Sequence, residues 1–421
     1  MRTAKSLAAV AAAALSLAAC GGVHVDQAKS GLSRDLAPQV PSADATELAA
    51  GNTAFAADLF KVVKDAKNSM VSPHSVSLAL AMTWAGAKGE TESAMAGALR
   101  FTLPQARLHA AFDQLDLALA SRGQGAQGKD GKPFRLTINN AAWGQVGYSF
   151  EPAYLDTLAV SYGAGVNLLD FAAAPEPSRK TINDWVAEKT EDRIKDLLSE
   201  GSISEMTRLV LTNTVYFNAS WLTKFEHERT AGSAFRLADG SAPSVPTMHG
   251  ELEGGYADAA DFTAAELPYD GGEVSMVVVL PKDGTTLEAF EAGLDGAKLQ
   301  AIAAALKPES LQVSLPKFKF ENKVSLRETL TALGMGVAFG DGADFTGIHQ
   351  PDDLYISDVI HQTFVAVDED GTEAAAATAV VLDGKAAPMG TEFKADRPFL
   401  FFIRDVQTGA VLFLGHVTDP R

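Results

Sequence analysis

The sequence predicts an α+β fold, and three observations lead to that prediction. Helical patterns dominate before residue 200, strand patterns cluster from residue 209 onward, and the two do not alternate regularly. Clustered strands argue against a repeated βαβ unit. With no internal repeat and no second linker in 421 residues, the simplest division is one domain over 47–421.

The first two helices have clear starts. Glu47–Lys67 places Phe55 and Leu59 on one face, and Ser72-Pro73 is a capping residue followed by a first-turn proline. The other predicted helices are Glu90–Leu99, Gln105–Ala120, one opened by Pro152, one opened by Pro177, Leu287–Leu306 and Val324–Leu333.

The predicted strands are β-branched or alternating runs bounded by turn residues. They are Phe134–Trp143, Leu209–Phe217, Phe262–Pro268, Val274–Pro281, Leu311–Phe320, Tyr355–Asp368, Phe399–Asp405 and Val411–Val417.

Composition excludes several classes of function. Apolar residues make up 47% and charged residues 21%, an ordinary globular mixture, while the net charge is −18 with no Lys/Arg cluster. Such a chain is a poor candidate for nucleic-acid binding, and its single Cys excludes a disulfide framework. No phosphate loop, nucleophile elbow or metal-spaced set occurs, and Ser72 and His74 lack an orienting acid, so we expect no cofactor, no metal and no enzyme.

The N-terminus has the pattern of an export signal. Arg2 and Lys5 precede an uncharged run, Leu7–Ala19, which is too short to span a bilayer and ends in small residues before Cys20. This resembles the lipobox of bacterial lipoproteins, which implies a signal peptide over 1–19 and a lipidated Cys20. Gly21 after the Cys then implies an outer-membrane or cell-surface lipoprotein, facing either the periplasm or the outside. The alternative is an ordinary secreted protein with an incidental Cys.

Residues 20–46 show no helical or strand period, so we expect a flexible tether from Cys20. Lipid would then be the only contact with the membrane.

The segment 369–393 is long for a loop between two strands. Read with a period of two, Thr372, Ala374, Ala376 and Thr378 share one small, uncharged face. The opposite face begins with Glu373, which we expect to remain in water. The segment is therefore able to join a sheet as a strand; an Ala-rich helix or a flexible linker is the alternative.

This segment closely resembles the hinge of inhibitory serpins. The matching hinge residues are Glu369, Gly371, Thr372, Glu373, Ala374, Ala375, Ala376, Ala377 and Thr378. The similarity continues in NDWVAEKTEDRIKDLL at 183–198, LTNTVYFNASWLTKF at 211–225 and further blocks over 47–421. The resemblance implies a serpin fold with three β-sheets, eight or nine helices and an exposed, insertable reactive loop at about 369–393.

The resemblance also implies a mechanism and a partner. A target serine protease attacks the loop and forms an acyl ester, and the cleaved loop inserts into the large sheet before the ester is hydrolysed. Small inward-facing hinge residues, and the absence of Pro from 369–387, meet the demands of insertion. The expected protein is a monomeric, suicide-type inhibitor.

Two polar clusters of the family carry over to this sequence. Ser72, Ser75, Asn213 and His361 match the shutter, where the central strands part. Trp221, Lys317 and Glu369 match the breach, where the loop enters the sheet. Ordinary buried polar groups and surface charges are the alternatives for both.

The bait is expected at Lys385–Ala386. In the family the scissile residue lies fourteen positions after the hinge Gly, which leads from Gly371 to Lys385, a residue suited to trypsin-like proteases. Counting back from Asp396 indicates Ala387 instead, but Pro388 follows it and would block most serine proteases.

Alternatives to this bait and function remain. An elastase-like cut would fall at Ala386 or Leu382, and Lys385 alone is also compatible with a solvated loop residue. Inhibition of a papain-like cysteine protease, a non-inhibitory serpin that binds a partner at the surface, and an adhesin are the other possibilities.

Overall fold

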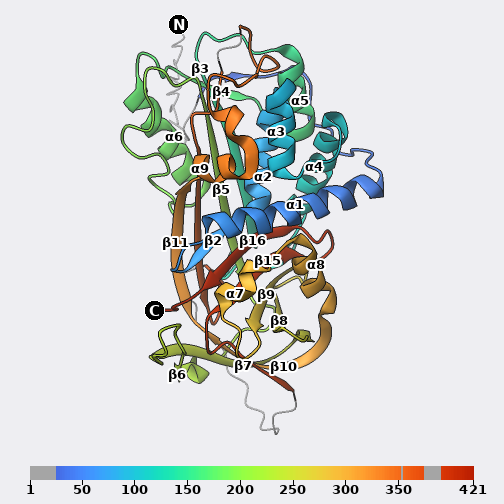
Figure 1. Cartoon of the computed structure of the whole chain (residues 1–421), viewed down its shortest axis with the longest axis vertical. Coiled ribbons are helices and arrows are strands. Elements are labelled where there is room, and N and C mark those ends of the chain that lie inside the picture. The colour runs from blue at the N-terminus through green and yellow to red at the C-terminus, as the bar shows by residue number, and fades with distance from the viewer. Residues whose placement is uncertain (1–24, 352–353, 374–389) are drawn as a thin grey trace, which may run out of the picture.

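The computed structural model describes residues 25–351, 354–373 and 390–421. Cys20, hinge residues Ala374–Thr378 and the expected bait Lys385–Ala386 therefore lie outside the described residues. In Figure 1 the long strands run the length of the molecule, with most helices on one side of them.

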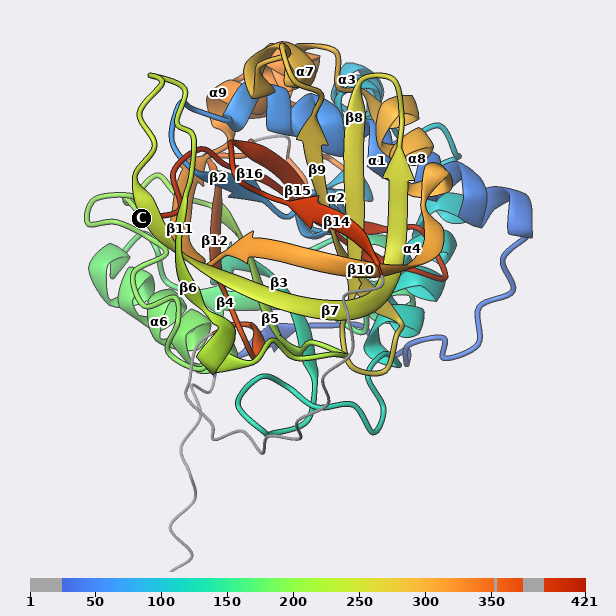
Figure 2. The ribbon, with the colours of Figure 1, turned by 90° about the horizontal axis from the view of Figure 1, so that it is seen from below.

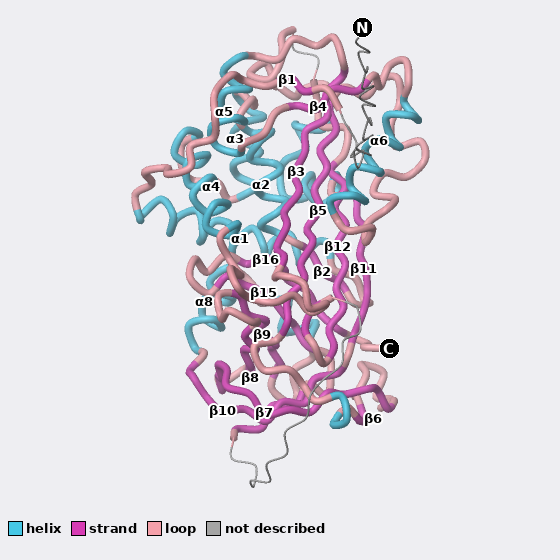
Figure 3. Tube along the Cα trace, turned by 180° about the vertical axis from the view of Figure 1, so that it is seen from behind, coloured by secondary structure: helices cyan, strands magenta, loops and turns pink. Residues whose placement is uncertain are grey.

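A seven-stranded sheet, here called the large sheet, forms the long axis of the fold. Strands β3, β5, β12 and β11 lie side by side along it (Figure 3). In spatial order its strands are β1 (Gln27–Ala28), β4 (Val166–Leu169), β3 (Arg135–Gln145), β5 (Leu209–Ser220), β13 (Gly371–Thr372), β12 (Val359–Asp368) and β11 (Phe318–Ser325).

A second, nine-stranded sheet fills the other end of the molecule. Its order is β14 (Thr391–Lys394), β10 (Lys307–Pro316), β7 (Ser244–Asp258), β8 (Phe262–Pro268), β9 (Val274–Pro281), β15 (Phe399–Asp405), β16 (Val411–Val417) and β2 (Ser69–Val71), with β6 (Ala231–Ala234) paired to β7. Where the family resemblance implies three sheets, hydrogen bonding joins two of them through the long β7. Strand β7 pairs with β6 and β10 along most of its length and with β8 at its end, as the view from below shows (Figure 2).

Nine α-helices occur in the described residues. They are α1 (Ser42–Val63), α2 (Pro73–Trp84), α3 (Gly89–Leu99), α4 (Gln105–Ala120), α5 (Pro152–Tyr162), α6 (Pro175–Lys189), α7 (Leu287–Ala292), α8 (Gly296–Ala305) and α9 (Arg327–Leu330). Helix α6 covers one face of the large sheet, where the Trp185 ring meets Trp143 of β3 edge-on at 5.4 Å. Helix α2, buried on all sides, packs against the opposite face, which we call the interior face.

Several predicted boundaries are confirmed and several are wrong. Gln105–Ala120 and the strands Phe262–Pro268 and Val274–Pro281 have the predicted ends. The predicted helix Leu287–Leu306 is two helices, because Asp295 accepts a hydrogen bond from Lys298 N and starts a new one.

Two further predictions near residue 320 are also corrected. The predicted strand Leu311–Phe320 is two strands, β10 and β11, which belong to different sheets. The predicted helix Val324–Leu333 begins only at Arg327, because β11 continues to Ser325.

Strand β7 was not predicted, because its glycines and exposed glutamates weaken the alternation of apolar and polar residues.

The prediction of a flexible tether over 20–46 is wrong for its described part. Residues 25–41, which we call the strap, lie against the domain: β1 pairs with β4, and the Arg34 guanidinium contacts α4. Helix α1 begins at Ser42, five residues before the predicted start. Sequence periodicity does not detect such a segment, because it is held by single contacts and not by a repeating apolar face.

Candidate functional site

The first hinge residues already belong to the large sheet. Gly371 and Thr372 form β13, which is antiparallel to both β5 and β12 and lies between them. A Cβ at Gly371 would lie 2.1 Å from the Ala219 carbonyl oxygen, so only glycine fits this close approach. The Thr372 hydroxyl lies 2.6 Å from that of Tyr269, which places Thr372 on the interior face.

Glu373 is buried, and the expectation that it remains in water is wrong here. Its carboxylate accepts hydrogen bonds from Arg193, from the Tyr216 hydroxyl at 2.7 Å and from the Asn218 amide. Because Thr372 faces the interior, Glu373 faces the side of the sheet that carries α6. Arg193, in the segment after α6, covers it there, and this ion pair compensates for the burial of the charge.

The backbone at Glu373 is also strained. Its φ of +94° lies in a region that favours glycine, whereas a continuing strand needs a negative φ. Burial, together with the neighbouring carboxylate of Glu373, raises the pKa of Tyr216 to about 12, so the phenol stays protonated and donates to Glu373. Glu373 is therefore held at the point where regular strand geometry stops.

The breach residues surround the turn that precedes the hinge. The Glu369 carboxylate accepts hydrogen bonds from Lys317 Nζ at 2.7 Å and from the Thr230 hydroxyl at 2.7 Å. Burial by itself raises the pKa of Glu369, but the bonds from Lys317 and Thr230 outweigh it and lower the pKa overall. His227 lies 3.6 Å from the same carboxylate.

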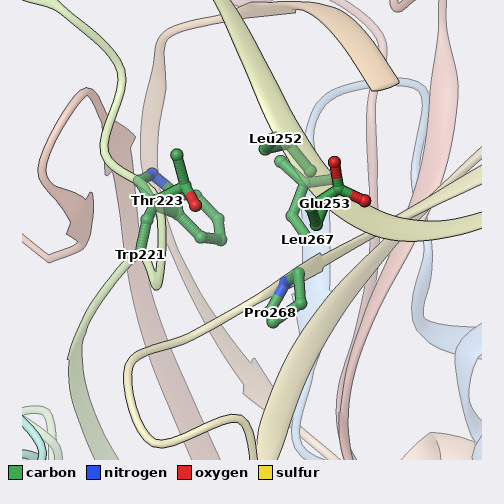
Figure 4. A pocket seen from close by; sticks show the side chains of 6 residues that line it. All are labelled: Trp221, Thr223, Leu252, Glu253, Leu267 and Pro268. Carbon is green, nitrogen blue, oxygen red and sulfur yellow. The ribbon is translucent and has the colours of Figure 1, made fainter. Parts of the chain in front are cut away.

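Trp221 holds the backbone of this turn and does not contact the Glu369–Lys317 pair through a hydrogen bond. Its indole nitrogen donates to the Asp368 carbonyl at 2.9 Å, its ring stacks on Tyr269 at 4.6 Å, and its backbone nitrogen donates to the Asp370 carbonyl. Trp221 also borders a small surface notch, opposite Leu252 and Leu267, that leaves no room for a water molecule (Figure 4). The notch is too shallow and too apolar to indicate a ligand.

The shutter residues meet in one hydrogen-bonded network. His361 Nδ1 lies 2.8 Å from the Asn213 side-chain oxygen, and the Asn213 amide donates to Ser75 and to Asn140. Ser72 donates its backbone N–H to His361 Nε2 at 2.9 Å. The Ser72 hydroxyl donates to the Leu412 carbonyl and does not cap α2, contrary to the capping role that the sequence predicts.

This network requires a neutral His361. Nε2 accepts from a backbone N–H, so Nδ1 carries the only ring proton and donates it to Asn213. Burial lowers the pKa of His361 to about 4, in agreement with that arrangement. The imidazole thus joins β12 to β5 and to the start of α2.

The junction of β5 and β12, which we call the seam, is closed along only part of its length. The two strands pair directly and in parallel over four positions, from Val359↔Leu211 to Gln362↔Thr214, and one of the four is His361↔Asn213. At the opposite end β13 separates them. The shutter therefore lies where the seam is closed, and the hinge where it is open.

Sequence reasoning missed several residues that complete the site. Asn140 pairs with Asn213 across β3 and β5. Tyr216 and Asn218 share one face of β5, so the strand period of two could have shown that these two side chains lie together. Lys129, which is buried and pairs with Asp368, comes from a Gly-rich loop that has no such signal. Arg193 likewise lies in an irregular segment.

The described residues hold no cluster of three or more His, Cys, Asp or Glu placed to bind a metal. Among these residues, no helix is both long and apolar enough to cross a bilayer.

Comparisons with known proteins agree with this geometry. The family model described as Serpin (serine protease inhibitor) matches residues 50–420. A serpin-like protein of Thermococcus kodakarensis is 39% identical over 371 residues, covering 87% of this chain and 84% of that protein. The leukocyte elastase inhibitor of Bos taurus is 38% identical over 388 residues, covering 89% of this chain and all of that protein.

The solved structures agree as well. The native state of the thermophilic serpin tengpin has a TM-score of 0.81 and 30% identity, covering 93% of this chain and 97% of that one. The chain belongs to the serpin family and has the serpin fold, a family whose members are described as protease inhibitors and not as enzymes.

Proposed function

We propose, on the premise that the chain is a serpin, that it is a suicide-type inhibitor of trypsin-like serine proteases. The protease serine attacks the carbonyl carbon of Lys385, the Lys385–Ala386 bond breaks, and the new amine leaves as the acyl ester forms. The cleaved loop then inserts as a strand of the large sheet and carries the ester with it. From Thr372 to Lys385 an extended strand spans on the order of 45 Å.

One observation carries the proposal: β13 already lies between β5 and β12. Its register, Thr372 opposite both Ala219 and Val367, defines where further residues would go. If that antiparallel register continues, Ala374 and Ala376 face the interior opposite Phe217 and Val215. Alanine at both positions keeps small the volume that insertion would add to the packed interior.

The same register assigns a role to the shutter. Insertion as far as Ala376 uses only the part of the seam where β5 and β12 do not pair directly. Thr378 would arrive opposite Asn213 and His361, so insertion past this point must break the His361–Asn213 hydrogen bond and the parallel pairs around it. The shutter is the barrier that complete insertion has to cross.

We further propose that the protein is a lipoprotein anchored through Cys20 at the bacterial outer membrane or cell surface. Val25, the first described residue, follows Cys20 by five positions, a separation of at most about 18 Å. Strand β1 lies at the end of the molecule opposite β7 and β10 (Figure 3). The lipid would then hold the domain close to the membrane and point the loop-bearing end away from it.

Denaturing electrophoresis of the full-length protein mixed with trypsin tests the inhibitory function. We expect a band at the summed mass that is lost in Lys385→Ala and retained in Lys180→Ala, a control at an exposed α6 lysine. Ala376→Arg should be cleaved without forming the band, because an arginine on the interior face blocks insertion.

Other outcomes identify the alternatives. A covalent band with elastase that persists in Lys385→Ala would move the bait to Ala386 or Leu382, and the name of the bovine relative makes elastase the first rival to try. Cleavage by trypsin, elastase and a papain-like protease without any covalent band would overturn the inhibitory function and favour a non-inhibitory, binding serpin.

Globomycin, which blocks the lipoprotein signal peptidase, tests the anchor. We expect it to cause the uncleaved precursor to accumulate, and Cys20→Ala to abolish incorporation of radiolabelled palmitate. Incorporation of the label into Cys20→Ala would contradict lipidation at this residue.

A further inference from the structure

The segments that lead into β5 and β12 border a cavity at the closed end of the seam. Arg208 immediately precedes β5, and Ser357 lies two residues before β12. The cavity measures about 140 Å³, far more than the roughly 15 Å³ that one water needs, and it is lined by Met206, Arg208, Tyr355 and Ser357. A strand that inserted along the whole seam would end beside this space.

Arg208 carries a positive charge that no carboxylate of the described residues neutralises. Its Nη1 donates to the carbonyls of Glu205 and Thr207 at 2.7 and 3.0 Å. Among the described arginines, only Arg327 is also without a carboxylate within 4.0 Å. In a chain with 53 acidic and 35 basic residues, such an arginine is an exception, and it indicates a site suited to a carboxylate.

The register of β13 defines which residue of the loop would reach this arginine. Its two ladders, continued without a shift, would place Val380 between Leu211 and Val359, which pair with each other while the seam is closed. The ladders on the two sides of the new strand therefore agree at this point. Three residues further along, Asp383 would lie opposite Arg208.

Asp383 and Arg208 would also face the same side of the sheet. Glu373 and its partner Asn218 face the side that carries α6, and they lie ten residues from Asp383 and Arg208 respectively. An even number of steps along a strand keeps the face. Asp383, which lies outside the described residues, is the single acidic residue between Glu373 and Glu392. A slip of one residue would turn its carboxylate to the interior face.

We propose that Arg208 is the receiving site for Asp383, and that their ion pair forms only when the loop has inserted completely. The Asp383 carboxylate would accept hydrogen bonds from the guanidinium, which has no carboxylate partner among the described residues before insertion. Lys385, two residues further along, would then lie opposite the exposed Met206. The proposal rests on loop insertion, as proposed above, and adds a contact that holds the end of the inserted strand.

The position of the cut decides whether this pair can form. After cleavage between Lys385 and Ala386, Asp383 remains part of the inserting strand. After an elastase-like cut that follows Leu382, Asp383 remains on the fragment that leads to β14, and the inserting strand ends before it reaches Arg208. The ion pair would therefore stabilise the inserted form that results from the Lys385 cut and not the one that results from the Leu382 cut.

A double-mutant cycle on the loop-cleaved protein tests the pair. The full-length protein in detergent is cut with a lysine-specific endopeptidase, mass spectrometry verifies the cut after Lys385, and the unfolding rate is measured in guanidinium chloride, first with low and then with high added salt. We expect Asp383→Asn and Arg208→Gln each to unfold about threefold faster than the unsubstituted protein. The double variant should unfold no faster than either single variant, because one substitution already removes the pair.

Arg327→Gln is the matched control. Arg327 also lacks a carboxylate partner among the described residues, and it donates to the Ser357 carbonyl at 2.7 Å, at the same end of the seam. Its effect on the unfolding rate should multiply with the effect of Asp383→Asn. Multiplication in the cycle with Arg208, or equal coupling of Asp383 to Arg327, would overturn the proposed pair.

Two outcomes separate the pair from the proposed function. If cleavage after Lys385 slows unfolding of the unsubstituted protein but Asp383→Asn changes nothing, the loop inserts and only the pair is contradicted. If cleavage does not slow unfolding at all, the loop does not insert, and both the pair and the inhibitory mechanism are contradicted. Arg208→Lys, which keeps the charge, replaces Arg208→Gln in the cycle if the glutamine variant does not fold, with partial loss of the coupling expected.

Discussion

The two ends of the seam are held by different chemistry. At the breach, carboxylates of the turn and hinge pair with cations: Glu369 with Lys317, Asp370 with Lys224, and Glu373 with Arg193. At the shutter, neutral groups of Asn213 and His361 share hydrogen bonds in a fully buried network. The open end of the seam is thus sensitive to salt and surface charge, and the closed end to a single proton and to exact geometry.

The difference indicates that a strand would insert into the large sheet in stages. The cations at the breach are partly exposed although their carboxylate partners are buried, so water can replace part of each ion pair at modest cost. Asn213 and His361 are buried, so breaking their hydrogen bonds leaves polar groups unsatisfied and costs more. Substitutions at the shutter should therefore have larger effects on stability than substitutions at the breach.

The largest expected effect is acid destabilisation through the shutter. Burial lowers the pKa of His361 to about 4, compared with about 6.5 when unfolded, so His361 contributes stability above pH 6.5 that is lost as pH falls toward 4. The full contribution is about 3 kcal/mol. Urea unfolding between pH 4 and 7.5 should show a shallower pH dependence for His361→Gln than for the unsubstituted protein.

Two other histidines do not confuse this comparison. Burial lowers the pKa of His74 and His109 to about 4 as well, with the same sign, and both remain in the variant. In His361→Gln, only the contribution of His361 to the pH dependence of stability disappears. An unchanged pH profile in His361→Gln would show that the shutter is not held by a neutral imidazole.

Removing the centre of the shutter should have the next largest effect. Asn213→Ala leaves His361 and Ser75 without their partner in a buried site, which costs about 2 to 3 kcal/mol of unfolding free energy. Asn139→Ala, on the neighbouring strand with one bond to the Lys189 carbonyl, is the control and should cost less than about 1 kcal/mol. Equal losses of unfolding free energy in the two variants, measured with urea, would show that the shutter contributes no more than an ordinary hydrogen bond between strands.

Releasing Glu373 should loosen the hinge by a smaller amount. Arg193→Ala leaves the buried carboxylate with only Tyr216 and Asn218, and because Arg193 is 38% exposed we expect a loss of about 1 to 2 kcal/mol. Hydrogen exchange at Thr372 and Glu373 should quicken. Glu373→Gln combined with Arg193→Ala should restore part of the protection, and no restoration would mean that the charge is not what holds the hinge.

The smallest effect is expected at the breach turn. Lys317→Met removes a partner that is 37% exposed, so the loss should be about 0.5 to 1 kcal/mol and should shrink as salt increases. Since Lys317 helps to lower the pKa of Glu369, that stability is present above pH 4.5 and lost as pH falls. Urea unfolding at low and high salt measures both, and a salt-independent loss would indicate packing and not charge.

Much of the fold was predictable because its signals are local. Strands β8, β9 and β15 have the predicted ends, since each is a short apolar run between turn residues. The four shutter residues and the three breach residues came from family resemblance, and the structure brings each set to one place. Periodicity alone would not have joined Ser72 to His361 across most of the chain.

Other features depended on contacts that no local pattern records. The burial of Glu373 follows from Arg193, which lies 180 positions earlier, and the docking of the strap follows from Asp113 and Asp116 on α4. From sequence alone, a carboxylate next to small residues is predicted to face solvent, because the distant cation that pairs with it is not recognised.

The sequence by itself determined the fold class, the family and the spacing of small residues in the hinge, because these depend on side-chain size and order along the chain. The tertiary structure alone decided that the hinge starts inside the sheet, that Glu373 is buried and that the strap contacts β4 and α4. Those outcomes depend on pairings between distant segments, whose energies arise only when the chain has folded and water has been excluded from between them.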